Sequence, residues 1–347
     1  MSPQGKVAMI TVGNAVLFLA LDETSYITGT ELVVDDGCRG VEGGHIMHTH
    51  VGIVGLGNAG SAMATALSGK MPLVGFDIDP GRRQAVAHLA LDCAASLADL
   101  ARRASAVVLS LPHPDISKRT VAEILESTPH PDLIIETSTV THTVAQELHA
   151  MCQARQVGFI DAAIANGVAS MAAGKITFLV GGVPEDVVKA EPILKAMAAS
   201  IMHLGPVGAG MGAKIVVNAV LHAVMVALIE ASAMATKLGL PMQTLVDILT
   251  REEGLMRPLT HRVQERIMQG NYAGGMSVSN ARKDSTLALA TAQELGIPLY
   301  AILASHTPYE IAEALGMGNL DYASLATLWE QWTGVRFSET EPHAHRR

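Results

Sequence analysis

The sequence predicts an α/β fold, in which a doubly wound sheet is followed by an all-helical domain, with a long connecting helix between them. From residue 50 to about residue 205, short β-rich runs alternate with helical stretches, as in a parallel sheet wrapped by helices. After Gly212 the strand signals mostly stop. Residues 213–238 then form one continuous helical pattern, which Gly239 terminates.

The length of the chain predicts more than one domain, because 347 residues exceed the usual size of a single one. The segments that we expect are an N-terminal extension of undetermined role (1–46), a sheet-containing domain (47–208), an all-helical domain (209–335) and a flexible tail (336–347).

The elements of the sheet-containing domain are predicted from local patterns. Ser96 and Asp99 have the spacing of a capping box before an apolar run, which predicts a helix start. Pro80 suits the first turn of another helix, because that position needs no N–H. Strands are expected at residues 50–54, 72–77, 106–111, 132–135, 157–160 and 175–180.

Composition argues against several classes of partner. The net charge is -9 and long Lys/Arg runs are absent, which disfavours a nucleic-acid partner. Aromatic residues make up only 3%, so stacking platforms for bases are not expected. Cys38, Cys93 and Cys152 are widely separated and lack CxxC spacing. They predict reduced thiols and a cytoplasmic location.

Two apolar runs bear on membrane association. Residues 7–21 follow a lysine, as in a signal peptide, but contain Gly13 and Asn14 and lack a small-residue cleavage site. Residues 215–229 are too few to span a bilayer comfortably and include polar side chains. We therefore expect a soluble protein without a membrane partner, in which the second run is a buried helix.

A glycine-rich loop follows the first predicted strand and precedes a helical pattern. Gly55, Gly57 and Gly60 form G-x-G-x-x-G in this strand–turn–helix setting. The first glycine permits the tight turn, the second lets a pyrophosphate approach, and the third lets the helix pack closely. This predicts a Rossmann-like dinucleotide-binding domain. The loop residues expected to bind the cofactor are Gly55, Leu56, Gly57, Asn58, Ala59 and Gly60.

The end of the second strand predicts which dinucleotide is bound. Asp77 stands where an acidic residue should reach the adenosine ribose hydroxyls, and its charge would repel a 2′-phosphate. NAD is therefore expected rather than NADP. Arg82 and Arg83 are nearby cations that would instead recruit such a phosphate. Alternatively, Asp77 only begins a turn and the two arginines form a solvated helix face.

Polar residues on the long helix predict a catalytic role. Lys214, Asn218 and His222 are spaced i, i+4 and i+8, so they share one face of an otherwise apolar helix. Lys214 at the helix start suits an acid/base, and Asn218 would hold it or a substrate oxygen in position. The alternative is a lysine that extends to solvent at a helix end. The spacing alone leaves both interpretations open.

Five motifs in order, from about residue 50 to residue 332, resemble the 3-hydroxyisobutyrate dehydrogenase family of β-hydroxyacid dehydrogenases, which is similar to 6-phosphogluconate dehydrogenase. The motifs are GLGNAGSAMA (55–64), VLSLP (108–112), Ser138-Thr139, GMGAKIVVN (210–218) and Lys283-Asp284.

The resemblance implies a role for several residues. Lys214 matches the general acid/base and Asn218 the residue that supports it. Lys283 matches a lysine that reaches the cofactor or the substrate. Leu111, Pro112 and Thr139 match residues on the nicotinamide side. The residues implied in substrate binding are Ser138, Ala165, Asn166, Gly167, Lys283 and Asp284.

The predicted substrate loop departs from the family pattern. The family reads Asp-Ala-Pro-Val-Ser-Gly-Gly, whereas residues 161–167 read Asp-Ala-Ala-Ile-Ala-Asn-Gly. Ala165 therefore replaces the serine that would donate to a substrate carboxylate, and Asn166 replaces the first glycine. The Asn166 amide offers another donor but is bulkier, so we expect a changed substrate.

Residues 14–35 resemble the C-terminal end of short-chain dehydrogenases, without that family's nucleotide loop or Tyr-x-x-x-Lys pair. We assign this segment no catalysis. His45, His48 and His50 form a cluster without accompanying carboxylates or cysteines, so no metal site is expected.

Together these features predict an oxidoreductase that transfers a hydride between NAD and a small 3-hydroxy acid or its semialdehyde. The alternatives are an imine-reductase-like NADP enzyme and a non-catalytic cofactor-sensing protein. Lys214 opposes the first, because imine reductases typically replace that lysine, and the altered loop supports the second. The long apolar helix predicts a homodimer or homotetramer.

Overall fold

The computed structural model describes residues 50–165, 168–251 and 254–338. The predicted extension 1–46 and most of the predicted tail lie outside these residues, as do Asn166 and Gly167. The chain divides after Gly212 into two compact units, each described here by itself.

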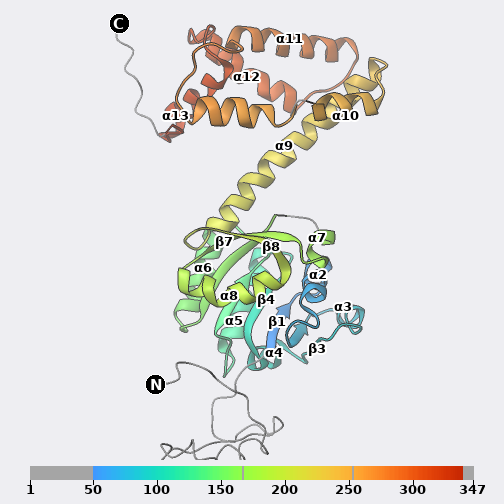
Figure 1. Cartoon of the computed structure of the whole chain (residues 1–347), viewed down its shortest axis with the longest axis vertical. Coiled ribbons are helices and arrows are strands. Elements are labelled where there is room, and N and C mark those ends of the chain that lie inside the picture. Colours follow the sequence, from blue (N-terminus) through green and yellow to red (C-terminus); the bar gives the residue numbers. More distant parts are fainter. Residues whose placement is uncertain (1–49, 166–167, 252–253, 339–347) are drawn as a thin grey trace, which may run out of the picture. The chain divides into compact units, whose positions relative to one another are not determined.

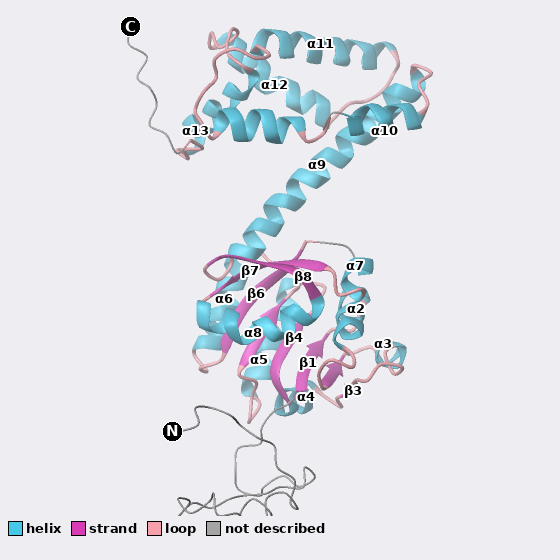
Figure 2. Ribbon diagram, in the orientation of Figure 1, coloured by secondary structure: helices cyan, strands magenta, loops and turns pink. Residues whose placement is uncertain are grey.

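The first unit contains an eight-stranded sheet (Figures 1 and 2), which confirms the predicted Rossmann-like α/β fold. The strand order is β3-β2-β1-β4-β5-β6-β7-β8. The order reverses between β1 and β4, and in such sheets ligands bind at the carboxyl ends of the strands beside this point. The strands are β1 (His50–Val54), β2 (Leu73–Phe76), β3 (Asp92–Cys93), β4 (Ala104–Leu109), β5 (Leu133–Glu136), β6 (Gly158–Ile164), β7 (Ile176–Gly182) and β8 (Ala198–Gly205).

The sheet differs from the sequence prediction at one side. β7 runs antiparallel to β6, whereas a parallel sheet was expected. The short connection after β6 explains this, because a parallel return needs a crossover of a dozen residues or more. β3 and β8 were not predicted. β3 has only two residues, and β8 is an edge strand whose side chains are largely exposed, so neither has a clear apolar alternation.

Helices cover both faces of the sheet, which explains why the central strands are apolar throughout. Ile53, Val108 and Ile135 face one core, packed against α2 (Asn58–Leu67), α7 (Val168–Ala172) and α8 (Pro184–Met197). Alternate strand residues such as Val107 and Ile134 are also fully buried. The remaining helices of this unit are α3 (Pro80–Ala85), α4 (Leu97–Arg103), α5 (Pro114–Glu126) and α6 (His142–Gln153).

Two predicted helix starts are confirmed by their hydrogen bonds. The Asp99 N–H donates to Ser96 Oγ at the start of α4, over 3.1 Å. Asp99 Oδ2 accepts from the Ala95 N–H, which completes a capping box displaced by one residue. Pro80 begins α3, and Asp79 caps that helix by accepting from the Gly81 N–H.

The long helix α9 spans Ala209–Lys237, so it begins four residues earlier than the sequence predicts. Gly239 has a φ of +81° and its N–H donates to Thr236, which confirms the predicted stop. With 29 residues, α9 is long and apolar enough to cross a membrane by length and composition alone. The 15-residue run that we judged too short therefore belongs to a longer helix. Most of its side chains are exposed in the single chain, so the prediction of a buried helix is wrong.

The second unit is helical, as predicted. A small core centred on Val278, Ala312 and Leu328 holds together the helices that contain these residues. Glu230 of α9 accepts the N–H groups of residues 300–302 and so caps a helix of this unit. The elements after α9 are α10 (Met242–Thr250), the π-helix η3 (Pro258–Ile267), α11 (Val278–Glu294), α12 (Ala301–Ala314), the 3-10 helix η4 (Tyr322–Leu325) and α13 (Ala326–Thr333).

Candidate active site

The glycine loop lies between β1 and α2. Gly55 has a φ of +90°, and a side chain there would meet the Ser110 carbonyl oxygen at 2.1 Å. A side chain at Gly60 would meet the Gly55 oxygen at 1.8 Å, so α2 packs directly on the turn. At Gly57 an added Cβ would meet only Arg82 Nη1, at 3.8 Å. The open space at Gly57, at the start of a helix, fits a bound pyrophosphate.

Asp77 lies just after β2 and organises this loop. It is 4% exposed, and its Oδ2 accepts the Leu56 N–H over 2.7 Å. Its Oδ1 accepts the Asp79 N–H over 2.9 Å. Each carboxylate oxygen retains a second acceptor site, so contact with a ribose remains a prediction.

The two arginines near Asp77 are placed differently. Arg83 folds back and donates to the Asp77 carbonyl oxygen over 2.6 Å. Arg82 lies between two carboxylates, 3.5 Å from Asp77 Oδ2 and 3.8 Å from Asp79 Oδ2. Arg82 is therefore the cation of this pair that stands beside the glycine loop, and its charge is already partly neutralised.

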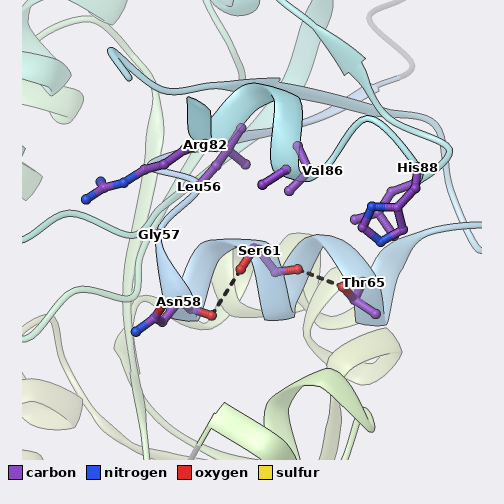
Figure 3. Close-up of a pocket in the computed structure, with 10 residues that line it drawn as sticks. Leu56, Gly57, Asn58, Ser61, Thr65, Arg82, Val86 and His88 are labelled. Carbon is purple, nitrogen blue, oxygen red and sulfur yellow. Dashed lines mark hydrogen bonds between the residues drawn. The ribbon is translucent and has the colours of Figure 1, made fainter. Parts of the chain in front are cut away.

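A pocket of about 440 Å³ lies between α2 and residues 82–89, which belong to α3 and to the turn that follows it. Figure 3 shows Arg82 and Asn58 at one end of it, and His88 and Thr65 at the other. Its lining residues are Leu56, Gly57, Asn58, Ser61, Thr65, Arg82, Ala85, Val86, His88 and Leu89. The pocket is thus continuous with the loop predicted to bind the dinucleotide.

The loops after β4 and β5 are joined by hydrogen bonds. Ser138 is buried, and its Oγ accepts the Leu111 N–H over 2.8 Å. Glu136 Oε1 in turn accepts the Ser138 N–H over 2.8 Å. Thr139, by contrast, is exposed. The buried side of this junction is therefore structural, and Thr139 is the residue that it presents to solvent.

Asp161 anchors the start of α9. This fully buried residue of β6 accepts the N–H groups of Gly208 (2.6 Å) and Met211 (2.8 Å). A carboxylate at a helix N-terminus also interacts favourably with the helix dipole. Burial raises the pKa of Asp161, although its two backbone donors oppose that rise. Lys214 follows Met211 by three residues on the same helix.

The predicted catalytic residues share one face of α9. Lys214 and Asn218 are both half-buried and lie one turn apart, whereas His222 is exposed. In the helical unit, Lys283 and Asp284 lie on α11, where the Lys283 Nζ is 2.9 Å from Asp284 Oδ1. Both are more than half exposed.

The predicted substrate loop begins at the end of β6. Ala165 is exposed, and its N–H donates to the Thr177 carbonyl oxygen over 3.0 Å. The expected donor Asn166 and its neighbour Gly167 lie outside the described residues.

Comparisons with known proteins cover both units. Residues 50–205 match the NAD-binding domain of 6-phosphogluconate dehydrogenase, and residues 208–329 match the NAD-binding domain of NADP-dependent 3-hydroxyisobutyrate dehydrogenase. A probable 3-hydroxyisobutyrate dehydrogenase of Mycobacterium tuberculosis is 30% identical over 80% of this chain and 96% of its own. The chain belongs to the 3-hydroxyisobutyrate dehydrogenase family.

The chain is also similar to another dehydrogenase and to two solved structures. A 2-(hydroxymethyl)glutarate dehydrogenase of Eubacterium barkeri is 27% identical over 83% of this chain and 97% of its own. The structure of the Mycobacterium tuberculosis 3-hydroxyisobutyrate dehydrogenase with L-serine has a TM-score of 0.57 at 28% identity, covering 82% of this chain and 99% of the other. An imine reductase of Myxococcus stipitatus has a TM-score of 0.75 at 17% identity, covering 81% and 99% respectively, and so shares the fold.

Sequence reasoning missed the roles of three acidic residues of the candidate site. The carboxylates of Glu136 and Asp161 accept buried hydrogen bonds that no local sequence pattern predicts. Asp79 had a visible signal, because Asp before Pro at a helix start is a capping pattern. It was not connected with Arg82, since their proximity depends on the turn between them.

The remaining candidate groups are the histidine cluster and the Cys152 thiol. Within residues 50–165, 168–251 and 254–338, no group of three or more His, Cys, Asp or Glu side chains is arranged to hold a metal ion. The predicted histidine cluster falls mostly outside these ranges. Burial raises the pKa of Cys152 to about 12, so its thiol stays protonated at neutral pH.

Proposed function

We propose that this protein is a dehydrogenase that uses NAD to oxidise a small 3-hydroxy acid, or to reduce the semialdehyde, with Lys214 as general acid/base. Membership of the dehydrogenase family supports an NAD(P)-dependent oxidoreductase. The observation that carries the catalytic assignment is the pair formed by Lys214 and Asn218, one turn apart on a helix whose start Asp161 anchors.

The proposed chemistry divides between the cofactor and the chain. A dinucleotide held by the glycine loop would supply the nicotinamide, which serves as the hydride acceptor for the carbinol carbon. Lys214 Nζ accepts the proton of the hydroxyl group in oxidation and returns it in reduction, so charge and atoms balance. Asn218 orients the reacting oxygen. Lys283 and Asn166 are proposed to bind the acid group, since Ala165 offers no side-chain donor.

Charges near the glycine loop support NAD over NADP. A 2′-phosphate beside Asp77 and Asp79 would approach two carboxylates, and both already neutralise Arg82. Like charges in contact are disfavoured, so the dinucleotide without that phosphate fits better.

The test of the catalytic assignment is Lys214→Met, with Lys237→Met on the last turn of the same helix as the control. We expect kcat to fall by about 10²- to 10⁴-fold in Lys214→Met, because general acid/base groups contribute that much. NAD affinity and melting temperature should stay near those of the wild type. Turnover within a few-fold of wild type would refute the role of Lys214.

A substrate screen distinguishes the proposed function from its alternatives. Hydroxy acids with one and two carboxylates, semialdehydes and cyclic imines are assayed with both NAD and NADP. The imines are included because imine reductases share the fold. Cofactor binding without turnover of any compound would favour a cofactor sensor.

The remaining proposals concern assembly and location. We propose a cytoplasmic homodimer or homotetramer that acts on a small molecule, without a nucleic-acid or membrane partner. The exposed apolar residues of α9 support subunit association, because so large an apolar helix surface is normally buried.

A further inference from the structure

We infer that Glu136 is a positioning residue, whose buried carboxylate holds Ser138, the residue that joins the loops after β4 and β5, and thereby sets the affinity for the dinucleotide. The inference rests on the proposed cofactor site, since it acts through Leu111, Ser138 and Thr139. No local sequence pattern points to Glu136.

The geometry forms a continuous chain of hydrogen bonds. Glu136 Oε1 accepts the Ser138 N–H, and Ser138 Oγ accepts the Leu111 N–H, each over 2.8 Å. Beside them, Thr137 Oγ1 donates to the Leu109 carbonyl oxygen over 2.6 Å. β4 and β5 are adjacent parallel strands, so this chain fixes the spacing between their two carboxyl ends.

Those two ends carry the residues proposed to meet the nicotinamide. Leu111 lies at one end of the chain of bonds, and Thr139 directly follows Ser138. A shift of either loop would therefore change the cofactor pocket without any direct contact between Glu136 and the cofactor. Small displacements of positioned groups have large effects on binding and rate.

Because of its surroundings, the charge of Glu136 changes with pH in the neutral range. The side chain is fully buried, and burial raises its pKa to about 7. The Ser138 and Ser117 side chains and the Ser138 N–H oppose this rise, whereas the negative charge of Asp161, its register partner on β6, adds to it. The charge of His142 on α6 in turn lowers the pKa of Asp161.

The sign of the pH effect follows from the hydrogen bond to Ser138. Above about pH 7 Glu136 is anionic, and a charged acceptor makes a stronger bond with the N–H. Below that pH it becomes protonated and the bond weakens. Affinity for the dinucleotide should therefore be highest above neutrality and fall as the pH drops through 7.

The experiment titrates the wild-type protein, Glu136→Gln and Glu136→Asp with NAD and NADH at pH 6 to 8.5. Glu123→Gln on α5, an exposed residue, is the control. For the wild type and the control, we expect Kd to rise about fivefold from pH 8 to pH 6, the difference between a charged and a neutral hydrogen bond. Glu136→Gln should keep the weaker, low-pH affinity at every pH, and Glu136→Asp should recover part of the pH dependence.

Melting temperatures at each pH separate loop positioning from loss of fold. A folded Glu136→Gln protein that retains the wild-type pH dependence would overturn the inference, as would a wild-type Kd that does not change with pH. The latter result does not depend on any variant. If the wild-type protein binds neither NAD nor NADH at any pH, the proposed function is overturned as well. If it binds them tightly with a Kd that does not change with pH, this inference alone is overturned.

Discussion

Acidic side chains hold the loops of the candidate site in place. Asp77 directly follows β2, Glu136 ends β5 and Asp161 lies within β6. Asp77 and Asp161 accept backbone N–H groups from other loops, whereas Glu136 accepts the Ser138 N–H of its own loop. A buried carboxylate is costly unless such donors satisfy it. These residues are therefore strongly coupled to the geometry of their loops, and single substitutions there should have measurable effects on binding.

Removing one carboxylate near Arg82 should relax the proposed preference for NAD. In Asp79→Ser the hydroxyl can still cap α3 at the Gly81 N–H, but Arg82 loses one of its two acidic partners. We expect Kd for NADP to fall about tenfold, equivalent to about 1.4 kcal/mol, with little change for NAD. Fluorescence titration with both cofactors measures this.

The control for that substitution is Glu126→Ser, which removes an exposed acid at the end of α5. It should leave both affinities unchanged. If Asp79→Ser and Glu126→Ser bind NADP equally well, the ion pairs of Arg82 do not govern cofactor choice.

At the scale of elements, the start of α9 is fixed by a contact with β6 of the same unit rather than by the helix sequence alone. Asp161 caps it from β6, and Gly210 lets it approach β7, because a Cβ there would lie 2.3 Å from the Leu179 oxygen. This explains why the helix begins at Ala209 instead of residue 213. It also fixes the first turn, from which Lys214 follows directly.

Asp161→Asn should loosen that anchor. An amide group can accept through one oxygen only, so one of the two N–H groups of Gly208 and Met211 is left unsatisfied. We expect a loss of about 1–3 kcal/mol in the free energy of unfolding. Because Lys214 moves with α9, kcat should fall more than KM rises.

Urea unfolding and steady-state kinetics test this, with Asp132→Asn, an exposed residue next to β5, as the control. A stable Asp161→Asn protein with normal kcat would show that the anchor has no bearing on catalysis.

At the scale of the whole molecule, the exposed apolar surface of α9 bears on how the chain assembles. Val216, Val220, Leu221 and Met225 are each more than half exposed. Exposed apolar stretches of this kind mark interaction surfaces. Length and composition also suit a membrane span, but Lys214, Asn218 and His222 interrupt one face of the helix, which favours contact with another protein chain.

Leu221→Glu should therefore weaken subunit association. A carboxylate buried in an apolar interface loses hydration, and we expect the dissociation constant of the oligomer to rise by about 100-fold. Light scattering after size exclusion measures the mass. Val188→Glu on α8, another exposed apolar position, is the control and should leave the mass unchanged. A monomeric wild type, or one recovered only with membranes, would contradict the proposed assembly.

Much of the fold could be predicted because its signals are local. The strand runs, the Ser96 and Asp99 cap and the Gly239 stop each depend on residues within a few positions of one another. The glycine loop was recognisable because its three glycines meet steric demands of a single turn, which the close approaches at Gly55 and Gly60 confirm.

The sequence by itself therefore determined the family and, apart from β3 and β8, the order of the strands, since periodicity and short motifs encode both. Only the tertiary structure decided the antiparallel direction of β7 and the hydrogen-bond partners of the site. Ser138 and Leu111 are 27 residues apart, and Asp161 and Gly208 are 47 apart. Such pairs form because packed strands bring distant backbone groups together in a water-poor interior, where each polar atom needs a partner. No local pattern specifies which partner that will be.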